Sequence, residues 1–217
     1  LLAFRACNFV WFIIFFAQET RKNANLAGKP HGSLTAVRAE FPPDYTTWCF
    51  YTQPWYWLLA VASSLMHLLL PEEGATATWV VRAGRYLRMC QWTLFEVILS
   101  SSWLVTLVVF TMLDPFAIRI VWNRVSHMHF WNAVALSVEF SINRLVVRAG
   151  HFVLMMIWII TYVIFAWCMK ATTWYTFVYW FMDLETPFAL MWYPILAAIH
   201  VLVYFSLVAF SRRKERR

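Results

Sequence analysis

The side chains of this chain that could do chemistry lie in apolar segments, where polar and ionisable groups are costly. Thr93, Glu96 and Ser100 are spaced by three and four residues, so they share one face of a helix. A hydroxyl, a carboxylate and an imidazole can form a nucleophile, an orienting group and a general base. A histidine within hydrogen-bond distance of the threonine could take its proton during attack on a carbonyl, and a carboxylate or amide could hold the imidazole in the right tautomer.

A second polar set lies between residues 129 and 143 and supplies a histidine. It contains His129, Asn132, Glu139 and Asn143, with Leu136 among them. At about 100° per residue, these positions fall within about 80° of one another on a helix. The spacing predicts a polar stripe that faces the interior of a helix bundle or a water-filled cavity.

These residues also have a structural interpretation, which stays open. Serine and threonine in membrane helices often bond to their own backbone or hold helices together, and a buried glutamate can pair with an arginine or a histidine. On spacing alone, the structural interpretation is favoured for Thr93, and neither is favoured for the stripe. His67 and His200 stand alone near apolar runs and are predicted to be satisfied or interfacial residues.

The composition indicates which elements position these residues. Of the 217 residues, 62% are hydrophobic and 13% are charged, whereas soluble domains have about 45–50% apolar and about 25% charged residues. A soluble chain of this length could not bury so much apolar surface in one core. The strict alternation of a membrane barrel is absent from the sequence. We therefore expect one all-α domain, a polytopic membrane helix bundle.

Six apolar stretches approach the roughly 20 residues that a helix needs to cross a bilayer. We expect about six transmembrane helices, over residues 1–17, 48–70, 87–113, 129–147, 151–170 and 187–210. Proline and glycine predict a loop within 18–47 and stops at 71–74 and 114–115, and the aromatic segment 172–185 predicts an interfacial helix or a re-entrant piece. Eleven of the 18 basic residues then fall on the side of both termini, which predicts that this side faces the cytoplasm, or an organelle's matrix or stroma.

The net charge of +7 does not indicate a nucleic-acid-binding protein, because the basic tail SRRKERR directly follows a predicted span. Topology and attraction to anionic lipids explain such a tail. The cysteines, Cys7, Cys49, Cys90 and Cys168, lack the spacing of a zinc site or a disulfide framework and are predicted to be buried, reduced thiols. No cofactor motif is present in the sequence. We expect membrane lipids, and other membrane subunits within an assembly, as partners.

One segment resembles a known family. HFWNAVALSVEF, from His129 to Phe140, is similar to rolling stone-like membrane proteins, in which H-x-x-N is followed by an acidic residue ten positions after the histidine. Further segments resemble this family in the same order along the chain: LLAFRACNFVWF, YTQPWYWLLA, QWTLFEVILSSSWLVT, RAGHFV and YWFMDLETP. The distantly related androgen-induced hydrolase family has a similar histidine and downstream glutamate.

The resemblance implies an enzymatic function as one hypothesis. Members of the androgen-induced branch are threonine hydrolases of fatty acid esters of hydroxy fatty acids, with a threonine in an early span and a histidine in a later one. By position, Thr93 and His129 would be this catalytic pair. Asn132, Glu139 or Glu96 would orient or support the histidine. The substrate would be a lipid ester that enters from the bilayer.

The identity of the histidine and the class of function each have a second interpretation. The family histidine usually follows an asparagine by four residues, and Asn123 stands in this relation to His127 rather than to His129. The chain could also be a non-catalytic accessory or scaffold subunit of a larger membrane complex, which binds lipid beside its basic loops. A channel or transporter is less supported, because broken helices at matching positions of two halves are not evident.

Overall fold

The computed structural model of the chain describes residues 1–27, 44–69, 78–113, 127–172, 177 and 179–216. Every regular element in these residues is helical and none is a strand, which confirms the all-α prediction. The α-helices are α1 (Leu2–Ala27), α3 (Tyr45–Leu69), α4 (Thr78–Val108), α6 (Asn132–Ile142), α7 (Phe152–Thr172) and α8 (Ala189–Glu215). Short π and 3₁₀ turns adjoin them: η1 (Val109–Leu113), η3 (His127–Trp131), η4 (Ala149–His151) and η5 (Trp180–Met182).

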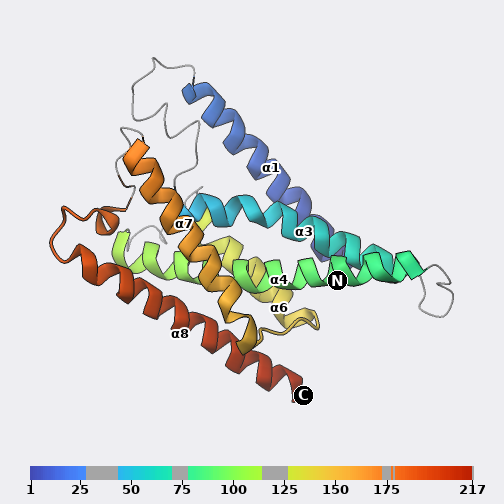
Figure 1. Cartoon of the computed structure of the whole chain (residues 1–217). Helices are drawn as coiled ribbons and strands as arrows, with labels where there is room; N and C mark the ends of the chain where they lie inside the picture. Colours follow the sequence, from blue (N-terminus) through green and yellow to red (C-terminus); the bar gives the residue numbers. More distant parts are fainter. Residues whose placement is uncertain (28–43, 70–77, 114–126, 173–176, 178, 217) are drawn as a thin grey trace.

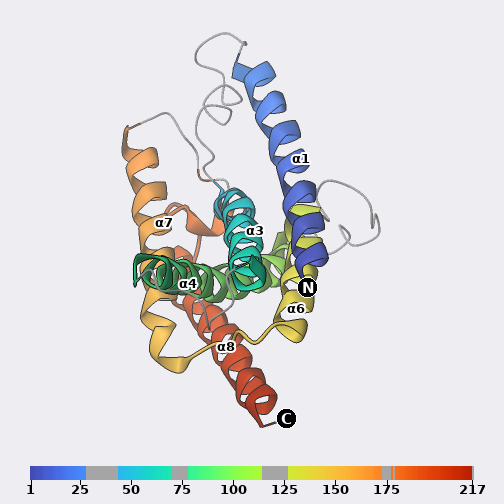
Figure 2. The same cartoon turned by 90° about the vertical axis from the view of Figure 1, so that its right-hand side faces the viewer.

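Helix α4 lies at the centre of the arrangement. It packs against α3, α6, α7 and α8, and α1 packs on α3. In Figure 1, α4 runs across the middle of the molecule, α7 crosses it obliquely and α8 runs obliquely below it. Figure 2 shows α1 and α7 on opposite sides of α3. Most of the buried polar residues therefore lie where another helix meets α4 or α3.

The outer faces of the helices are apolar. Three described helical stretches are long and apolar enough to span a bilayer: residues 79–113, 149–172 and 189–215. On α7, Val153, Ile157 and Ile164 are 60%, 54% and 57% exposed. Exposed apolar side chains on such a helix are unfavourable in water and favourable against acyl chains. These features are those of a membrane protein.

Two helices are longer than the apolar runs that predict them. α1 continues to Ala27, past the predicted end of its span at residue 17, and α4 begins at Thr78, before residue 87. The additional turns contain polar residues. Once a helix is nucleated, extending it through such residues costs little free energy. The predicted loop 18–47 therefore begins with helix, and its residues 28–43 lie outside the described residues, as do 71–74 and 114–115.

The helix predicted over 129–147 ends earlier, at Ile142. Asn143 is extended, with φ −92° and ψ 178°, and its side-chain oxygen accepts a hydrogen bond from the Leu145 N–H at 2.9 Å. Lys214, from the last turn of α8, donates to the carbonyls of Phe140 and Leu145. The segment after Ile142 is therefore not helical, and the side chains of Asn143 and Lys214 form hydrogen bonds to its backbone.

The remaining predictions about local structure have mixed outcomes. All four cysteines are free, as predicted, but only Cys49 is buried and the other three are exposed, so the predicted burial was wrong for those three. Residues 173–176 and 178 of the segment 172–185 lie outside the described residues. In the rest of this segment, Phe181 and Met182 of η5 are buried.

Candidate functional site

Two buried carboxylates organise the polar residues of the bundle. Glu96 on α4 is 1% exposed and Glu139 on α6 is 0% exposed. Asn132, Leu136 and Asn143 are also buried, which confirms that the stripe on α6 faces the interior. His129, in η3, is half-buried. Charged groups at such depth need partners, and both carboxylates have them.

Glu139 is held by Arg5 of α1. The Nε of Arg5 donates to Glu139 Oε1 at 2.8 Å, and its Nη2 lies 2.6 Å from the same oxygen. The hydroxyl of Tyr56 on α3 donates to that oxygen at 3.1 Å. Arg5 also donates to two α3 groups, the carbonyl of Ala60 at 3.1 Å and the hydroxyl of Ser64 at 2.6 Å. The pair therefore ties α1, α3 and α6 together.

The same network reaches the end of α8. Asn143 Nδ2 donates to Glu139 Oε1 at 3.1 Å, one turn along the stripe. Lys214 Nζ, on α8, donates to Asn143 Oδ1 at 3.2 Å. We call Arg5, Tyr56, Glu139, Asn143 and Lys214 the Glu139 network. It joins four helices at the end of the molecule where α1 begins and α8 ends.

Glu96 has a histidine as its partner. His151 Nδ1 lies 2.6 Å from Glu96 Oε2, and the backbone N–H of Arg148 donates to Glu96 Oε1 at 2.8 Å. The His151 ring meets the Trp92 ring edge-on, with centroids 5.1 Å apart, and the Arg148 guanidinium lies 4.4 Å from the Trp92 ring centroid. The sequence predicts that a carboxylate meets an imidazole, but His151 was missed. The sequence feature that could have indicated His151 is its position at the start of a predicted apolar span, shortly after basic residues.

The structure does not bring Thr93 and His129 together. The carbonyl of His129 accepts a hydrogen bond from the hydroxyl of Thr106, which follows Thr93 by thirteen residues on α4. At about 1.5 Å per residue, about 20 Å of helix separates Thr93 from the turn that contacts His129. Within the described part of the chain, the carboxylate–imidazole contact of the bundle is the one between Glu96 and His151.

The remaining predicted residues bond within their own helices. Asn132 Nδ2 donates to the carbonyl of Met128 at 2.9 Å, and its oxygen accepts from the Ala133 N–H at 2.6 Å. The Ser100 hydroxyl donates to the carbonyl of Glu96 at 2.9 Å. These contacts match the structural interpretation of the polar residues. Asn123 and the side chain of the second candidate histidine, His127, lie outside the described residues.

An open groove of about 1040 Å³ lies beside the two carboxylates. Its lining includes five arginines from α1, α4 and the segment after α6: Arg5, Arg85, Arg88, Arg144 and Arg148. We call it the arginine groove. Arg5 is paired with Glu139. Arg85, Arg88 and Arg144 are exposed and have no carboxylate within 4.0 Å among the described residues.

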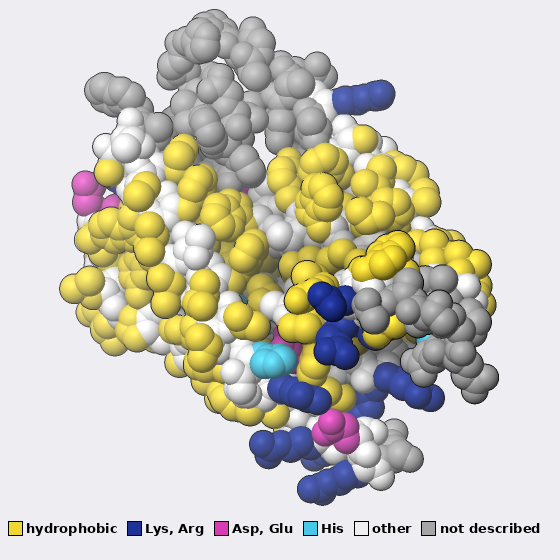
Figure 3. Space-filling model, turned by 45° about the vertical axis from the view of Figure 1, so that its right-hand side comes forward, with side chains coloured by type: hydrophobic (Ala, Val, Ile, Leu, Met, Phe, Trp, Pro, Cys, Tyr) yellow, Lys and Arg dark blue, Asp and Glu magenta, His cyan; other side chains and the backbone are white. Residues whose placement is uncertain are grey.

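Basic side chains gather at one end of the molecule, and hydrophobic side chains cover most of the rest of the face shown in Figure 3. The groove residues come from the start of α1, the end of α3, the start of α4 and the segment 142–148. Each of these segments is at a helix end that the sequence places on the side of both termini. The groove therefore lies at one end of the helix bundle.

Comparisons of the chain with protein-family models, with curated proteins and with solved structures find no match. The resemblance of residues 129–140 to rolling stone-like proteins stays a prediction. What the molecule does is therefore inferred from the chemistry of its own residues.

Proposed function

We propose that the chain is a multi-span membrane protein that binds an anionic phosphate headgroup of a lipid in the arginine groove and catalyses no reaction there. The observation that carries this proposal is that five arginines line one open volume and that three of them lack a carboxylate partner among the described residues. A guanidinium offers paired N–H donors that match phosphate oxygens. A bound phosphate offsets the mutual repulsion of these cations and gives them hydrogen-bond acceptors.

The proposal includes a six-crossing topology, with both termini on the side of the groove. Basic residues favour the cytoplasmic side of a membrane, and the anionic lipids of that leaflet attract them. The contact of Lys214 with Asn143 supports the topology, because it joins the last turn of α8 to the segment between α6 and α7. In this arrangement the groove opens at the level of lipid phosphates.

The two carboxylate clusters have a positioning role in this proposal. Glu139 fixes the guanidinium of Arg5 at the groove, and Glu96 fixes the backbone of Arg148. Both carboxylates are buried, so they hold these residues without placing negative charge at the surface. Residues that are already held lose less conformational entropy when they bind a phosphate than free side chains do.

The hydrolase hypothesis has less support from the geometry. About 20 Å of α4 separates Thr93 from the turn that contacts His129, as described above. The imidazole of His151 is bonded to Glu96, but no hydroxyl or thiol bonds to it among the described residues. A nucleophile within hydrogen-bond reach of the base is what such chemistry requires.

The proposal is tested by native mass spectrometry of the purified protein with phosphatidylglycerol, phosphatidylcholine and soluble glycerol phosphate. We expect phosphatidylglycerol to be retained over phosphatidylcholine. The variant Arg85→Gln/Arg88→Gln/Arg144→Gln should bind phosphatidylglycerol at least about tenfold more weakly, because it removes the three guanidinium groups that have no carboxylate partner among the described residues. Glycerol phosphate separates a site for a free phosphate compound from a site that also needs acyl chains.

The matched control is Arg82→Gln/Arg212→Gln/Arg216→Gln, which removes the same charge at exposed positions that do not line the groove. It should leave the preference for phosphatidylglycerol intact. Equal losses in the two variants would show that net charge, rather than a site, attracts the lipid. Equal retention of the two lipids by the unaltered protein would reject the proposal outright.

A further inference from the structure

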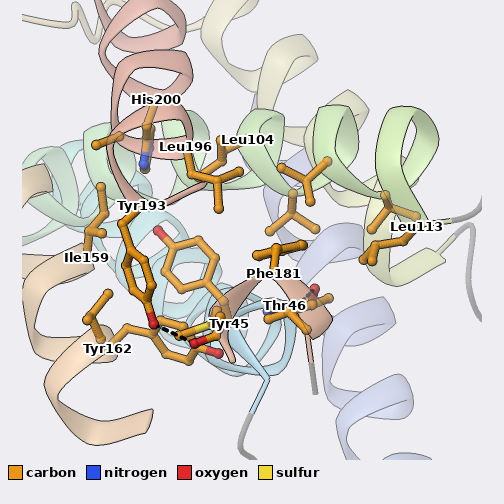
Figure 4. Close-up of a pocket in the computed structure, with 17 residues that line it drawn as sticks. Tyr45, Thr46, Leu104, Leu113, Ile159, Tyr162, Phe181, Tyr193, Leu196 and His200 are labelled. Carbon is orange, nitrogen blue, oxygen red and sulfur yellow. Dashed lines mark hydrogen bonds between the residues drawn. The ribbon is translucent and has the colours of Figure 1, made fainter. Parts of the chain in front are cut away.

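A second cavity lies away from the arginine groove, near the other ends of the helices. It has a volume of about 110 Å³ and lies between the start of α3, the end of α4, α7, η5 and the first half of α8. Its walls are mainly apolar and aromatic, and include Leu104, Ile159, Phe181 and Leu196 (Figure 4). None of the residues that line it belongs to the Glu139 network or to the arginine groove.

Three tyrosines of the cavity wall already have partners. The hydroxyl of Tyr45 donates to a serine of α4 at 2.8 Å, and that of Tyr193 donates to the carbonyl of Met182 at 2.8 Å. The hydroxyls of Tyr179 and Thr46 lie 3.2 Å apart. Burial raises the pKa of Tyr179 above its ordinary value, so this hydroxyl keeps its proton. These groups need no ligand to satisfy them.

His200 differs from these tyrosines. Its side chain is 0% exposed and lines the cavity, and neither of its ring nitrogens has a hydrogen-bond partner among the described residues. Figure 4 shows its ring extending from α8 on the same side of the cavity as Tyr193 and Leu196. A partner that would make His200 a satisfied residue, as the sequence predicts, is therefore not among the described residues. A neutral imidazole carries one donor and one acceptor, and buried groups of this kind are rarely left unpaired.

The size and lining of the cavity restrict what could satisfy this imidazole. A cavity of about 150 Å³ with apolar walls binds benzene, so a volume of about 110 Å³ suits one ring or a short chain end. Aromatic walls favour a ring, because ring pairs gain from edge-to-face contacts. A charged group would be unfavourable among these side chains. A hydroxyl is uncharged and can donate or accept, so it can bond to His200 in either tautomer.

We propose that this cavity binds the ring of a membrane-dissolved alcohol, with the ring hydroxyl bonded to the imidazole of His200. The rest of the ligand extends through the open side of the cavity into the lipid. This site goes beyond the headgroup site at the arginine groove, because it uses different residues and recognises a neutral group.

The proposal is tested by photolabelling the full chain in phosphatidylcholine vesicles. The probe is an aromatic alcohol, a phenol that carries a diazirine on an alkyl tail, and its methyl ether is the comparison compound. We expect the alcohol to label residues that line the cavity about tenfold more than the ether does, as read by mass spectrometry of peptides. His200→Leu should reduce labelling by the alcohol to the level of the ether, whereas His200→Gln, which retains a donor and an acceptor, should keep most of it.

Two further variants separate binding from folding. Ala197→Phe fills the cavity and leaves His200 in place, so it should abolish labelling of the lining residues by both compounds. Leu202→Gln, at a position 68% exposed on the same helix, should change neither. Equal labelling by the alcohol and the ether would overturn the role of the hydroxyl. Unchanged labelling in both His200→Leu and Ala197→Phe would overturn the site.

Discussion

Arg5 and Glu139 form an ion pair that is almost completely removed from the surface, at 6% and 0% exposed. Such a pair contributes little net stability compared with two apolar residues of similar volume, because desolvation offsets the attraction. Breaking it by removing one partner is costly, since the other charge is left buried and alone. The pair therefore specifies how α1 docks on α3 and α6 more than it adds to stability.

This reasoning predicts a difference between single and double variants. Glu139→Leu should lower the free energy of unfolding by about 3–5 kcal/mol, because the Arg5 guanidinium remains buried without its carboxylate. Arg5→Leu/Glu139→Leu should recover most of this loss. Thermal unfolding followed by tryptophan fluorescence measures both. A double variant as unstable as the single one would show that the carboxylate stabilises the fold by other contacts.

The sequence predicts the buried carboxylate of each pair but not the residue that pairs with it. Glu96 and Glu139 stand out because a carboxylate within an apolar run is costly, and the spacing of their neighbours places them on interior faces. Their partners, His151 and Arg5, lie 55 and 134 residues away in the chain, on other elements. Spacing along one helix carries no information about which other helix faces it, so the pairing with His129 was expected instead.

At the scale of elements, the C-terminal end of α6 depends on a residue of α8. The last carbonyls of a helix have no partner within it and need one elsewhere. Lys214 donates to the carbonyl of Phe140 and to Asn143 Oδ1, so it satisfies the end of α6 from outside. The sequence predicts the helices well, because apolar runs fix where they exist. The sequence misplaces the C-terminal end of α6. The lysine that satisfies this end, Lys214, is 71 residues from Asn143, so the spacing of residues along α6 does not indicate the contact.

We expect Lys214→Met to loosen the end of α6 without unfolding the bundle. Hydrogen exchange of the amides of residues 140–145 should become about tenfold faster, because local opening no longer breaks the lysine contacts. Arg212→Met, an exposed position on the same turn, is the control and should leave these amides unchanged. If both variants accelerate exchange equally, charge in the tail rather than the Lys214 contacts stabilises this end.

At the scale of the whole molecule, the two candidate sites lie near opposite ends of the helices. The arginine groove is lined by the start of α1 and the start of α4. The cavity that His200 lines is bounded by the start of α3 and the first half of α8. α1 and α4 thus begin at the end of the bundle that holds the groove, and α3 and α8 begin at the end that holds the cavity. Composition predicts a membrane protein, and three helices meet the length and hydropathy of a span.

The six-crossing topology predicts which positions share a side of the membrane. On a cysteine-free background, Arg85→Cys and Arg216→Cys should react with an impermeant maleimide from one side. Arg21→Cys and Thr172→Cys should react from the other, since α1 and α7 would each cross once. All four positions are exposed. Labelling of Arg21→Cys from the same side as Arg85→Cys would reject the crossing by α1.

The length of α8 has a consequence for the surrounding lipid. This helix contains 27 residues, which extend about 40 Å at about 1.5 Å per residue, and its last turn carries Arg212, Arg213 and Lys214. The hydrocarbon layer of a typical bilayer is about 30 Å thick, so a helix of this length tilts or projects beyond the layer. In the six-crossing topology, a thicker membrane should therefore draw the basic last turn of α8 closer to the level of the anionic headgroups, and a thinner one should leave it in water.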